Sequence, residues 1–170
     1  SNTSELVVNS DSIILNPNEG LVYYLDKPFT GTAIKQNVYG KPAVSTQYEN
    51  GKKHGVLKKW FLIGDLSYIA VYEKGRQTGI AKSWWKNGKL RTESNFQNGV
   101  VHGLQRQWYQ SGNKFKELNY KDGTENGLQK AWRENGKLFI NYEARDGRTY
   151  GLKRANLCYE LNNEEVQYKN

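Results

Sequence analysis

The sequence of 170 residues has no methionine and a single cysteine, Cys158. One cysteine excludes an intrachain disulfide and any metal site built on several thiolates. No apolar run approaches the roughly 20 residues that cross a bilayer as a helix. Because a natural reading frame starts with methionine, we expect an upstream segment to have been removed, and whether it held an export signal stays open. Two locations follow: exported or envelope-associated, or cytoplasmic if there was no signal.

Groups suited to catalysis are also scarce. The two histidines, His54 and His102, occupy the same place in a repeat. Such a recurrence favours a turn residue over a catalytic or metal role, because a metal site needs several convergent ligands. No nearby histidine or basic helix terminus in the sequence activates Cys158. The adjacent Glu164 and Glu165 point opposite ways in an extended chain. We therefore expect neither an enzyme nor a bound cofactor or metal.

What the sequence has instead is aromatic and basic residues. Only 36% of residues are hydrophobic, yet 12 tyrosines and 5 tryptophans stand beside 5 phenylalanines. Tyrosine and tryptophan carry a polar tip, so they suit half-buried surfaces such as those of a thin layer. The net charge is +8. That balance indicates either an anionic partner or simply solubilising lysines and arginines on strand faces.

The sequence is organised by a period of 24 residues, marked by three glycine columns and two aromatic columns. The first glycine column is Gly31, Gly55, Gly79, Gly103, Gly127 and Gly151. The second is Gly40, Gly64, Gly88, Gly112 and Gly136, and the third is Gly51, Gly75, Gly99, Gly123 and Gly147. The tryptophan column is Trp60, Trp84, Trp108 and Trp132, and the other aromatic column is Tyr24, Tyr48, Tyr72, Phe96 and Tyr120. A fixed period of this kind indicates a repeat architecture.

Each repeat predicts a β-hairpin. One strand of about eight residues is expected to run from the first glycine to the second, and another from there to the third. Asn-Gly and Asp-Gly pairs favour type I′ turns, which need positive φ at both central residues. They are Asn50–Gly51, Asn87–Gly88, Asn98–Gly99, Asp122–Gly123, Asn135–Gly136 and Asp146–Gly147. No connection is long enough for a crossover helix. The predicted fold is all-β: an elongated antiparallel β-meander of repeated 24-residue hairpins, either flat or curled.

Three segments are expected. Residues 1–20 form an N-terminal lead and short cap strands at Leu6–Val8 and Ile13–Leu15. Residues 21–160 form the repeat array, in which Pro28 suits an edge strand because it cannot donate a ladder hydrogen bond. Residues 161–170 form a polar C-terminal tail, and a last strand is expected around residues 157–161. A divergent polar end keeps a stack of repeats soluble.

The repeat pattern G-[LIV]-x-[KR]-x-W-[aromatic]-x-N-G-K-L, followed by Y-x-[ND]-G-x-x-H-G, resembles the bacterial variant of the MORN repeat. Residues 79–103 match it best, including Trp84, Trp85, Asn87–Leu90, Phe96, Asn98–Gly99 and His102–Gly103. Departures occur near the array's ends, at Gln36, Ala144 and Asn156. The resemblance implies an elongated antiparallel hairpin sheet that serves as a scaffold. Such arrays are implied to bind acidic phospholipids or to act as platforms for protein interaction or dimerisation. Bacterial proteins with this variant repeat are antitoxin-like or secreted repeat proteins.

The candidate binding residues follow two columns. A basic column two residues before each tryptophan contains Lys58, Lys82, Arg106, Lys130 and Arg154. With the aromatic residues beside it, it gives the candidate site Lys58, Trp60, Lys82, Trp84, Trp85, Arg106, Trp108, Tyr109, Lys130 and Trp132. In one interpretation, the cationic stems pack on the tryptophan rings. In the other, the column binds a regularly spaced anion. Paired aromatics such as Trp84 and Trp85 are expected on opposite sheet faces, so that one face exposes them unless the sheet curls.

The leading hypothesis is a non-enzymatic scaffold that binds an unknown protein partner, with an antitoxin- or immunity-like role as one form of it. The alternative is binding to an anionic phospholipid membrane surface through the basic and aromatic columns. The interspersed acidic residues and the absence of a nucleic-acid-binding motif disfavour nucleic acid. The sequence leaves the oligomeric state open.

Overall fold

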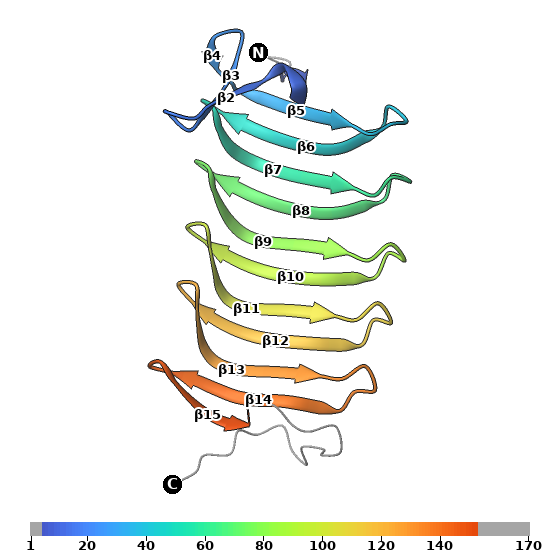
Figure 1. Cartoon of the computed structure of the whole chain (residues 1–170), viewed down its shortest axis with the longest axis vertical. Coiled ribbons are helices and arrows are strands. Elements are labelled where there is room, and N and C mark those ends of the chain that lie inside the picture. The colour runs from blue at the N-terminus through green and yellow to red at the C-terminus, as the bar shows by residue number, and fades with distance from the viewer. Residues whose placement is uncertain (1–4, 153–170) are drawn as a thin grey trace. The chain divides into compact units, whose positions relative to one another are not determined.

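The computed structural model describes residues 5–152, and the chain divides into two compact units, Ser1–Gly79 and Ile80–Asn170. The structure confirms the predicted fold class: consecutive antiparallel strands form a meander, and residues 5–152 contain no α-helix. Strands alternate in direction in the order of the chain (Figure 1). The predictions for Cys158, Glu164–Glu165, Arg154, Asn156, the last strand and the polar tail lie outside the described residues.

The first unit begins with short cap elements and continues with long strands. The cap consists of β1 (Val7–Asn9), the single 3-10 turn η1 (Ser10–Ser12), β2 (Ile14–Asn16), β3 (Leu21–Tyr24) and β4 (Lys27–Pro28). The long strands are β5 (Gly31–Gln36), β6 (Pro42–Glu49), β7 (Lys52–Trp60) and β8 (Leu66–Glu73). The strand β9 (Arg76–Trp84) carries the chain into the second unit. Strands β5 to β8 pair antiparallel, while β1 pairs parallel with the outer edge of β5.

The second unit continues the same arrangement. Its strands are β10 (Leu90–Gln97), β11 (Val100–Trp108), β12 (Lys114–Lys121), β13 (Thr124–Trp132), β14 (Leu138–Arg145) and β15 (Arg148–Leu152). Each pairs antiparallel with the next. The hairpins therefore repeat with the period that the glycine columns predict.

Two kinds of turn alternate along the meander. Tight turns join β6–β7, β8–β9, β10–β11, β12–β13 and β14–β15, and both central residues have positive φ: Asn50–Gly51, Lys74–Gly75, Asn98–Gly99, Asp122–Gly123 and Asp146–Gly147. These confirm the type I′ prediction. The prediction is wrong at Asn87–Gly88 and Asn135–Gly136, where only the glycine has positive φ. There the turn is longer: Trp85 N–H donates to the Lys89 carbonyl oxygen, and Gly88 N–H donates to that of Trp85. A glycine that ends such a longer turn suffices to reverse the chain.

In the first glycine column only Gly31 begins a strand, β5, and the prediction is wrong for the later members up to Gly127. Strands β7, β9, β11 and β13 start three residues earlier, at Lys52, Arg76, Val100 and Thr124. Gly55, Gly103 and Gly127 lie inside these strands with φ of +96°, +82° and +100°. The register jumps there: Ser94 pairs with Gln105 but Phe96 pairs with Val101, so three residues of β11 face the single residue Asn95. These are β-bulges, and Figure 1 shows β7, β11 and β13 bending near their tight turns.

Amide side chains opposite the bulges bond the backbone groups that the bulges leave unpaired. Asn119 Nδ2 donates to the Leu128 carbonyl oxygen at 2.7 Å, and the buried Gln129 Nε2 donates to the Asn119 carbonyl oxygen at 2.6 Å. In the first unit, Val56 N–H donates to Gln47 Oε1 at 2.6 Å. Unpaired buried backbone groups are costly, so these amides allow the strands to bend.

A row of buried side chains crosses the strands at the bend. In the first unit the paired residues Ala33, Thr46, Leu57 and Ala70 are all buried. In the second unit Ala81, Gln105 and Gln129 occupy the same repeat position as Ala33 and Leu57, and they are also buried. This column alternates with the Leu–Lys–Trp positions, of which Ile80 and Leu128 stay 48% and 41% exposed. At the bend the sheet thus buries small and amide side chains, while the opposite face is buried at Trp132 and Leu138.

The cap strands β2, β3 and β4 form a separate three-stranded sheet that docks on the β6–β7 turn. Val22 N–H donates to the Gly51 carbonyl oxygen at 2.9 Å, and Gly51 N–H donates to that of Phe29 at 2.8 Å. The ring of Phe29 is 2% exposed and lies 5.9 Å from the Tyr24 ring and 5.7 Å from the Tyr48 ring. In β4, Pro28 is on an edge of this sheet, as its missing N–H predicts.

Candidate interaction surfaces

The ten residues that the sequence singled out take equivalent places in the strands. We call them the basic–aromatic stripe. Lys58, Lys82, Arg106 and Lys130 each lie two residues before the end of β7, β9, β11 or β13, and Trp60, Trp84, Trp108 and Trp132 end those strands. Trp85 and Tyr109 come directly after a strand end and begin the longer turns. Strand alternation therefore does not assign them to the face opposite their tryptophan neighbours, as the sequence had suggested.

The charge of the stripe is partly balanced in the second unit. Glu93 on β10 lies between two of its cations: Lys82 Nζ is 3.4 Å from Glu93 Oε2, and Arg106 Nη1 is 3.6 Å from Glu93 Oε1. The Glu93 side chain is 22% exposed, against 41% for Lys82 and 45% for Arg106. A carboxylate between two cations weakens the field that an external anion meets. These two residues are therefore poorer anion receptors than the column in the sequence suggests.

The tryptophan rings contact cations from outside the basic column. The Arg91 guanidinium lies 4.6 Å from the Trp85 ring centroid, and Lys114 Nζ lies 5.2 Å from that of Trp132. Contacts of this type contribute roughly 0.5–1 kcal/mol at exposed sites. The expected cation–π packing exists at these rings, but its cations come from the neighbouring strand rather than from Lys82 or Arg106.

The aromatic residues of the stripe also hold successive hairpins together. Trp85 Nε1 donates to the Trp108 carbonyl oxygen at 3.1 Å, and the Tyr109 hydroxyl donates to that of Trp132 at 2.8 Å. Trp84, Trp85, Trp108 and Tyr109 are half-buried, and Trp132 is only 6% exposed. These two repeats thus use their second aromatic residue to bond the backbone of the next repeat. This structural role accounts for much of the aromatic pattern.

The two histidines also form hydrogen bonds with the backbone. His54 and His102 lie inside β7 and β11, and their Nδ1 atoms accept from the backbone N–H of Lys74 and Asp122, each at 3.3 Å. Both N–H groups belong to the next tight turn along the sheet. Within residues 5–152, no group of three or more histidine, cysteine, aspartate and glutamate side chains could hold a metal ion.

The structure adds a surface that the sequence reasoning missed. The longer turns β5–β6 and β7–β8 present Val38, Tyr39, Leu62 and Ile63, which are 86%, 71%, 54% and 72% exposed. We call these four residues the apolar turn pair. Asn37 Nδ2 donates to the Leu62 carbonyl oxygen at 3.4 Å, which links the two turns. Equivalent positions of later repeats are polar: Lys86, Asn87, Gln110, Ser111, Glu134 and Asn135. An alignment of the repeats could have revealed this contrast.

Comparison with known proteins supports the repeat assignment. The family model of the MORN repeat variant matches residues 77–98 and 101–122, which are two adjacent repeats. These include Trp84, Trp85 and Trp108 of the stripe. No curated protein matches the chain. Among residues 5–152, the structure has no helix long and apolar enough to cross a membrane.

Proposed function

We propose that this chain is a non-enzymatic β-repeat scaffold that binds a protein partner through the apolar turn pair. The observation that carries the proposal is the exposure of four large apolar side chains on two linked turns, at positions where later repeats are polar. Folding does not require apolar residues there, because the other turns form with polar ones. Contiguous exposed apolar groups are typical of interaction surfaces.

The charges around the apolar turn pair indicate which charged groups the partner's surface carries. Lys35, Lys41 and Lys59 flank the two turns, and Asp65 is the single acidic residue within residues 35–41 and 58–65. None of the three lysines forms an ion pair in the part of the chain that the structure describes. The partner therefore presents an apolar patch bordered by carboxylates, since complementary charge speeds association and selects among partners.

The test compares two double substitutions at one repeat position. V38S/L62S removes apolar side chains of the turn pair, and K86S/E134S changes the equivalent exposed tips of later turns without altering the net charge. Affinity capture from the source cells, followed by binding measurements with the captured protein, should show a loss of roughly tenfold or more for V38S/L62S, as for apolar anchors of an interface. The control should bind like the wild type. Equal recovery by both variants would refute the proposal.

The basic–aromatic stripe remains a proposed second contact surface. Its accessible members are Lys58 and Arg106, both exposed, and the half-buried Trp84 and Trp108. K58E/R106E reverses charge without removing an aromatic ring that holds the hairpins. If the stripe contacts the same acidic partner, this variant weakens capture, and added salt weakens wild-type capture in parallel. An antitoxin- or immunity-like role, in which the partner is a toxic protein, stays a prediction.

Binding to an anionic membrane surface is the second candidate function. The observation in its favour is the same pairing of apolar tips with flanking lysines, which suits the boundary between headgroups and acyl chains. Co-sedimentation with phosphatidylserine vesicles, with phosphatidylcholine vesicles as control, separates the two functions. Salt-sensitive binding to the acidic vesicles that is lost in V38S/L62S supports the membrane function. No binding to acidic vesicles, together with capture of a protein partner, leaves the first proposal standing alone.

A further inference from the structure

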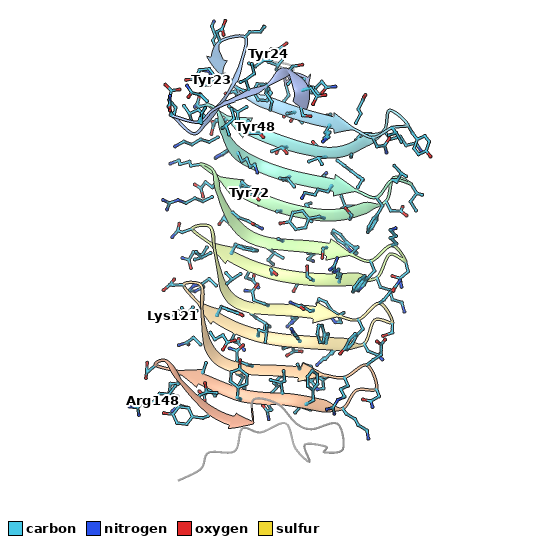
Figure 2. All side chains as sticks on the ribbon, viewed as in Figure 1. Tyr23, Tyr24, Tyr48, Tyr72, Lys121 and Arg148 are labelled. Atoms are coloured by element: carbon cyan, nitrogen blue, oxygen red, sulfur yellow. The ribbon has the colours of Figure 1, made fainter. Side chains whose placement is uncertain are left out.

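A cleft of about 600 Å³ lies within the first unit, between the three-stranded sheet and two tight turns. One wall comes from Ile13, Leu15, Gly20 and Val22 of the cap. The other comes from the β6–β7 and β8–β9 turns with their neighbouring tyrosines: Tyr48, Gly51, Lys52, Lys53, Tyr72, Lys74, Gly75 and Arg76. Tyr48 and Tyr72, labelled in Figure 2, lie toward the tight-turn ends of β6 and β8. The volume falls within the range of small-molecule sites, roughly 300–1,000 Å³.

The apolar wall is held firmly against the turns. Backbone hydrogen bonds join Val22 to Gly51 and Gly51 to Phe29, at 2.9 and 2.8 Å. A Cβ atom on Gly51 would lie 2.9 Å from the Val22 carbonyl oxygen, so the two segments are in close contact. The buried ring of Phe29 packs between Tyr24 and Tyr48 behind this junction. The cleft is therefore a built feature rather than a gap between loosely associated segments.

Four cations line the opposite wall: Lys52, Lys53, Lys74 and Arg76. Lys53 Nζ lies 5.2 Å from the Tyr72 ring centroid. None of the four forms an ion pair within residues 5–152. No acidic residue lines the cleft. Of the acidic residues next to the lining in sequence, Glu49 lies 3.5 Å from His54 Nε2, Glu19 accepts from Tyr23 and Asn16, and Glu73 stays outside the lining. An incoming anion would meet uncompensated positive charge.

The repeat itself does not require these cations. The next two tight turns of the second unit carry neutral or acidic residues at the positions of Lys74, Lys52 and Lys53: Asn98, Val100, Val101, Asp122, Thr124 and Glu125. Those turns have the same backbone conformation, with positive φ at both central residues. The cationic set occurs where the cap supplies an apolar wall. Coincidence of the two features in one cleft points to a ligand.

We propose that this cleft binds a small organic carboxylate with an apolar chain. The carboxylate lies among Lys53, Lys74 and Arg76, where charged donors form the stronger class of hydrogen bond. The chain lies along Ile13, Leu15 and Val22, from which it displaces water. A small polar anion would leave the apolar wall wet, and an uncharged chain would leave the cations unpaired. Recognition therefore requires both parts of the ligand.

The experiment is a calorimetric titration of the purified chain with decanoate below its micelle-forming concentration. Decanol supplies the chain without the charge, and acetate supplies the charge without the chain. Saturable binding of decanoate at one site, with much weaker binding of decanol and acetate, is the expected result. No saturable decanoate binding overturns the proposal. Equal binding of decanol overturns recognition of the anion, and equal binding of acetate overturns the role of the apolar wall.

Matched variants locate the site. K53Q/R76Q should weaken decanoate binding by about tenfold or more, because each lost charged hydrogen bond removes roughly that factor. K121Q/R148Q changes cations near the tight turns of the second unit, labelled in Figure 2, and should bind like the wild type. On the apolar side, L15N should weaken binding, while L25N, at an exposed cap residue outside the lining, should not. Circular dichroism verifies that each variant folds; equal decanoate affinity of folded K53Q/R76Q and wild type overturns the site.

Discussion

The side-chain amide of Gln105 forms hydrogen bonds with both backbone groups of Asn95, the N–H and the carbonyl oxygen. Asn95 N–H donates to Gln105 Oε1 at 3.0 Å, and Gln105 Nε2 donates to the Asn95 carbonyl oxygen at 3.1 Å. Gln105 is 5% exposed, and Asn95 is the residue that faces the bulge of β11. The side chain thus replaces the ladder hydrogen bonds that the bulge removes.

Replacing Gln105 with leucine should destabilise the second unit. Leucine fills the space but leaves the N–H and carbonyl groups of Asn95 without these partners, and each unsatisfied buried group costs about 1–3 kcal/mol. Chemical denaturation should report this loss. Hydrogen exchange should place it at the β10–β11 bulge. An unchanged midpoint would show that water replaces the amide.

The first unit indicates how such a variant could be rescued. There the equivalent buried position is Leu57, and the residue opposite the bulge is Gln47, whose Oε1 accepts from Val56 N–H. The double variant N95Q/Q105L copies this pairing and should recover at least half of the stability lost in Q105L. A double-mutant cycle measures the coupling between the two positions. Additive losses in the double variant would contradict the interchangeability of the two pairings.

Gly51 and Gly75 offer a matched pair of substitutions at the tight turns. Their φ values are +78° and +85°, so alanine strains either backbone by roughly 1–2 kcal/mol. At Gly51 the new Cβ also meets the Val22 carbonyl oxygen at 2.9 Å, whereas at Gly75 its nearest neighbour is Lys52 Cβ at 3.9 Å. G51A should therefore lower the melting temperature more than G75A. It should also speed exchange of the Val22 amide, and similar exchange in both variants would argue against cap docking through this junction.

The Tyr142 hydroxyl should titrate unusually high. Burial and the hydrogen bond to Glu125 raise the pKa of Tyr142 to about 12 from the ordinary 10.0. Because the folded pKa lies above the unfolded one, this contribution to stability is complete below pH 10 and is lost as the pH rises toward 12. Ultraviolet titration of tyrosinate should lose its highest step in Y142F. In E125Q that step should shift down, and an unchanged profile would contradict the role of Glu125.

Replacing Glu93 should change binding more than stability. E93Q removes the carboxylate between Lys82 and Arg106, whose exposed ion pairs contribute at most about 1 kcal/mol. The same change leaves two neighbouring cations unbalanced. Retention on a polyanionic column should therefore increase while the denaturation midpoint moves little. E49Q provides a control, because it makes the same change of charge and the ion-pair partner of Glu49, His54, lies outside the stripe. Unchanged retention of E93Q would show that the stripe does not face added anions.

The period and the hairpins could be predicted from the sequence because glycine and aromatic residues recur without a slip. The structural roles of individual glycines, in a turn or in a bulge, could not be predicted from the sequence. Gly51 in a tight turn and Gly55 in a bulge both have positive φ, so residue type alone does not separate them. Distinguishing them requires the strand register, which depends on amides such as that of Gln47, which bonds Val56 nine residues away. The sequence reasoning therefore placed the strand starts three residues late.

Each candidate surface was likewise visible in the sequence only in part. The basic column was visible in the sequence, but Glu93 reaches two of its members from a neighbouring strand, and only the fold brings them together. The apolar turn pair was visible as Val38–Tyr39 and Leu62–Ile63, but hydrophobic residues near strand ends resemble core positions. The cleft depends on docking of the cap through Val22 and Gly51, and the repeat pattern carries no information about residues outside it.

The parallel pairing of β1 with β5 covers the edge of the first long strand. The edge of β5 at Thr32, Ala33 and Ile34 is occupied by Val7, Val8 and Asn9. The Thr32 N–H donates to the Leu6 carbonyl oxygen. An exposed edge strand is a template for another chain. Here a few non-repeat residues occupy that template, so a second copy cannot polymerise onto this edge without first displacing them. The edge that remains on this side is that of β1, which is only three residues long, and a very short edge strand is a poor template.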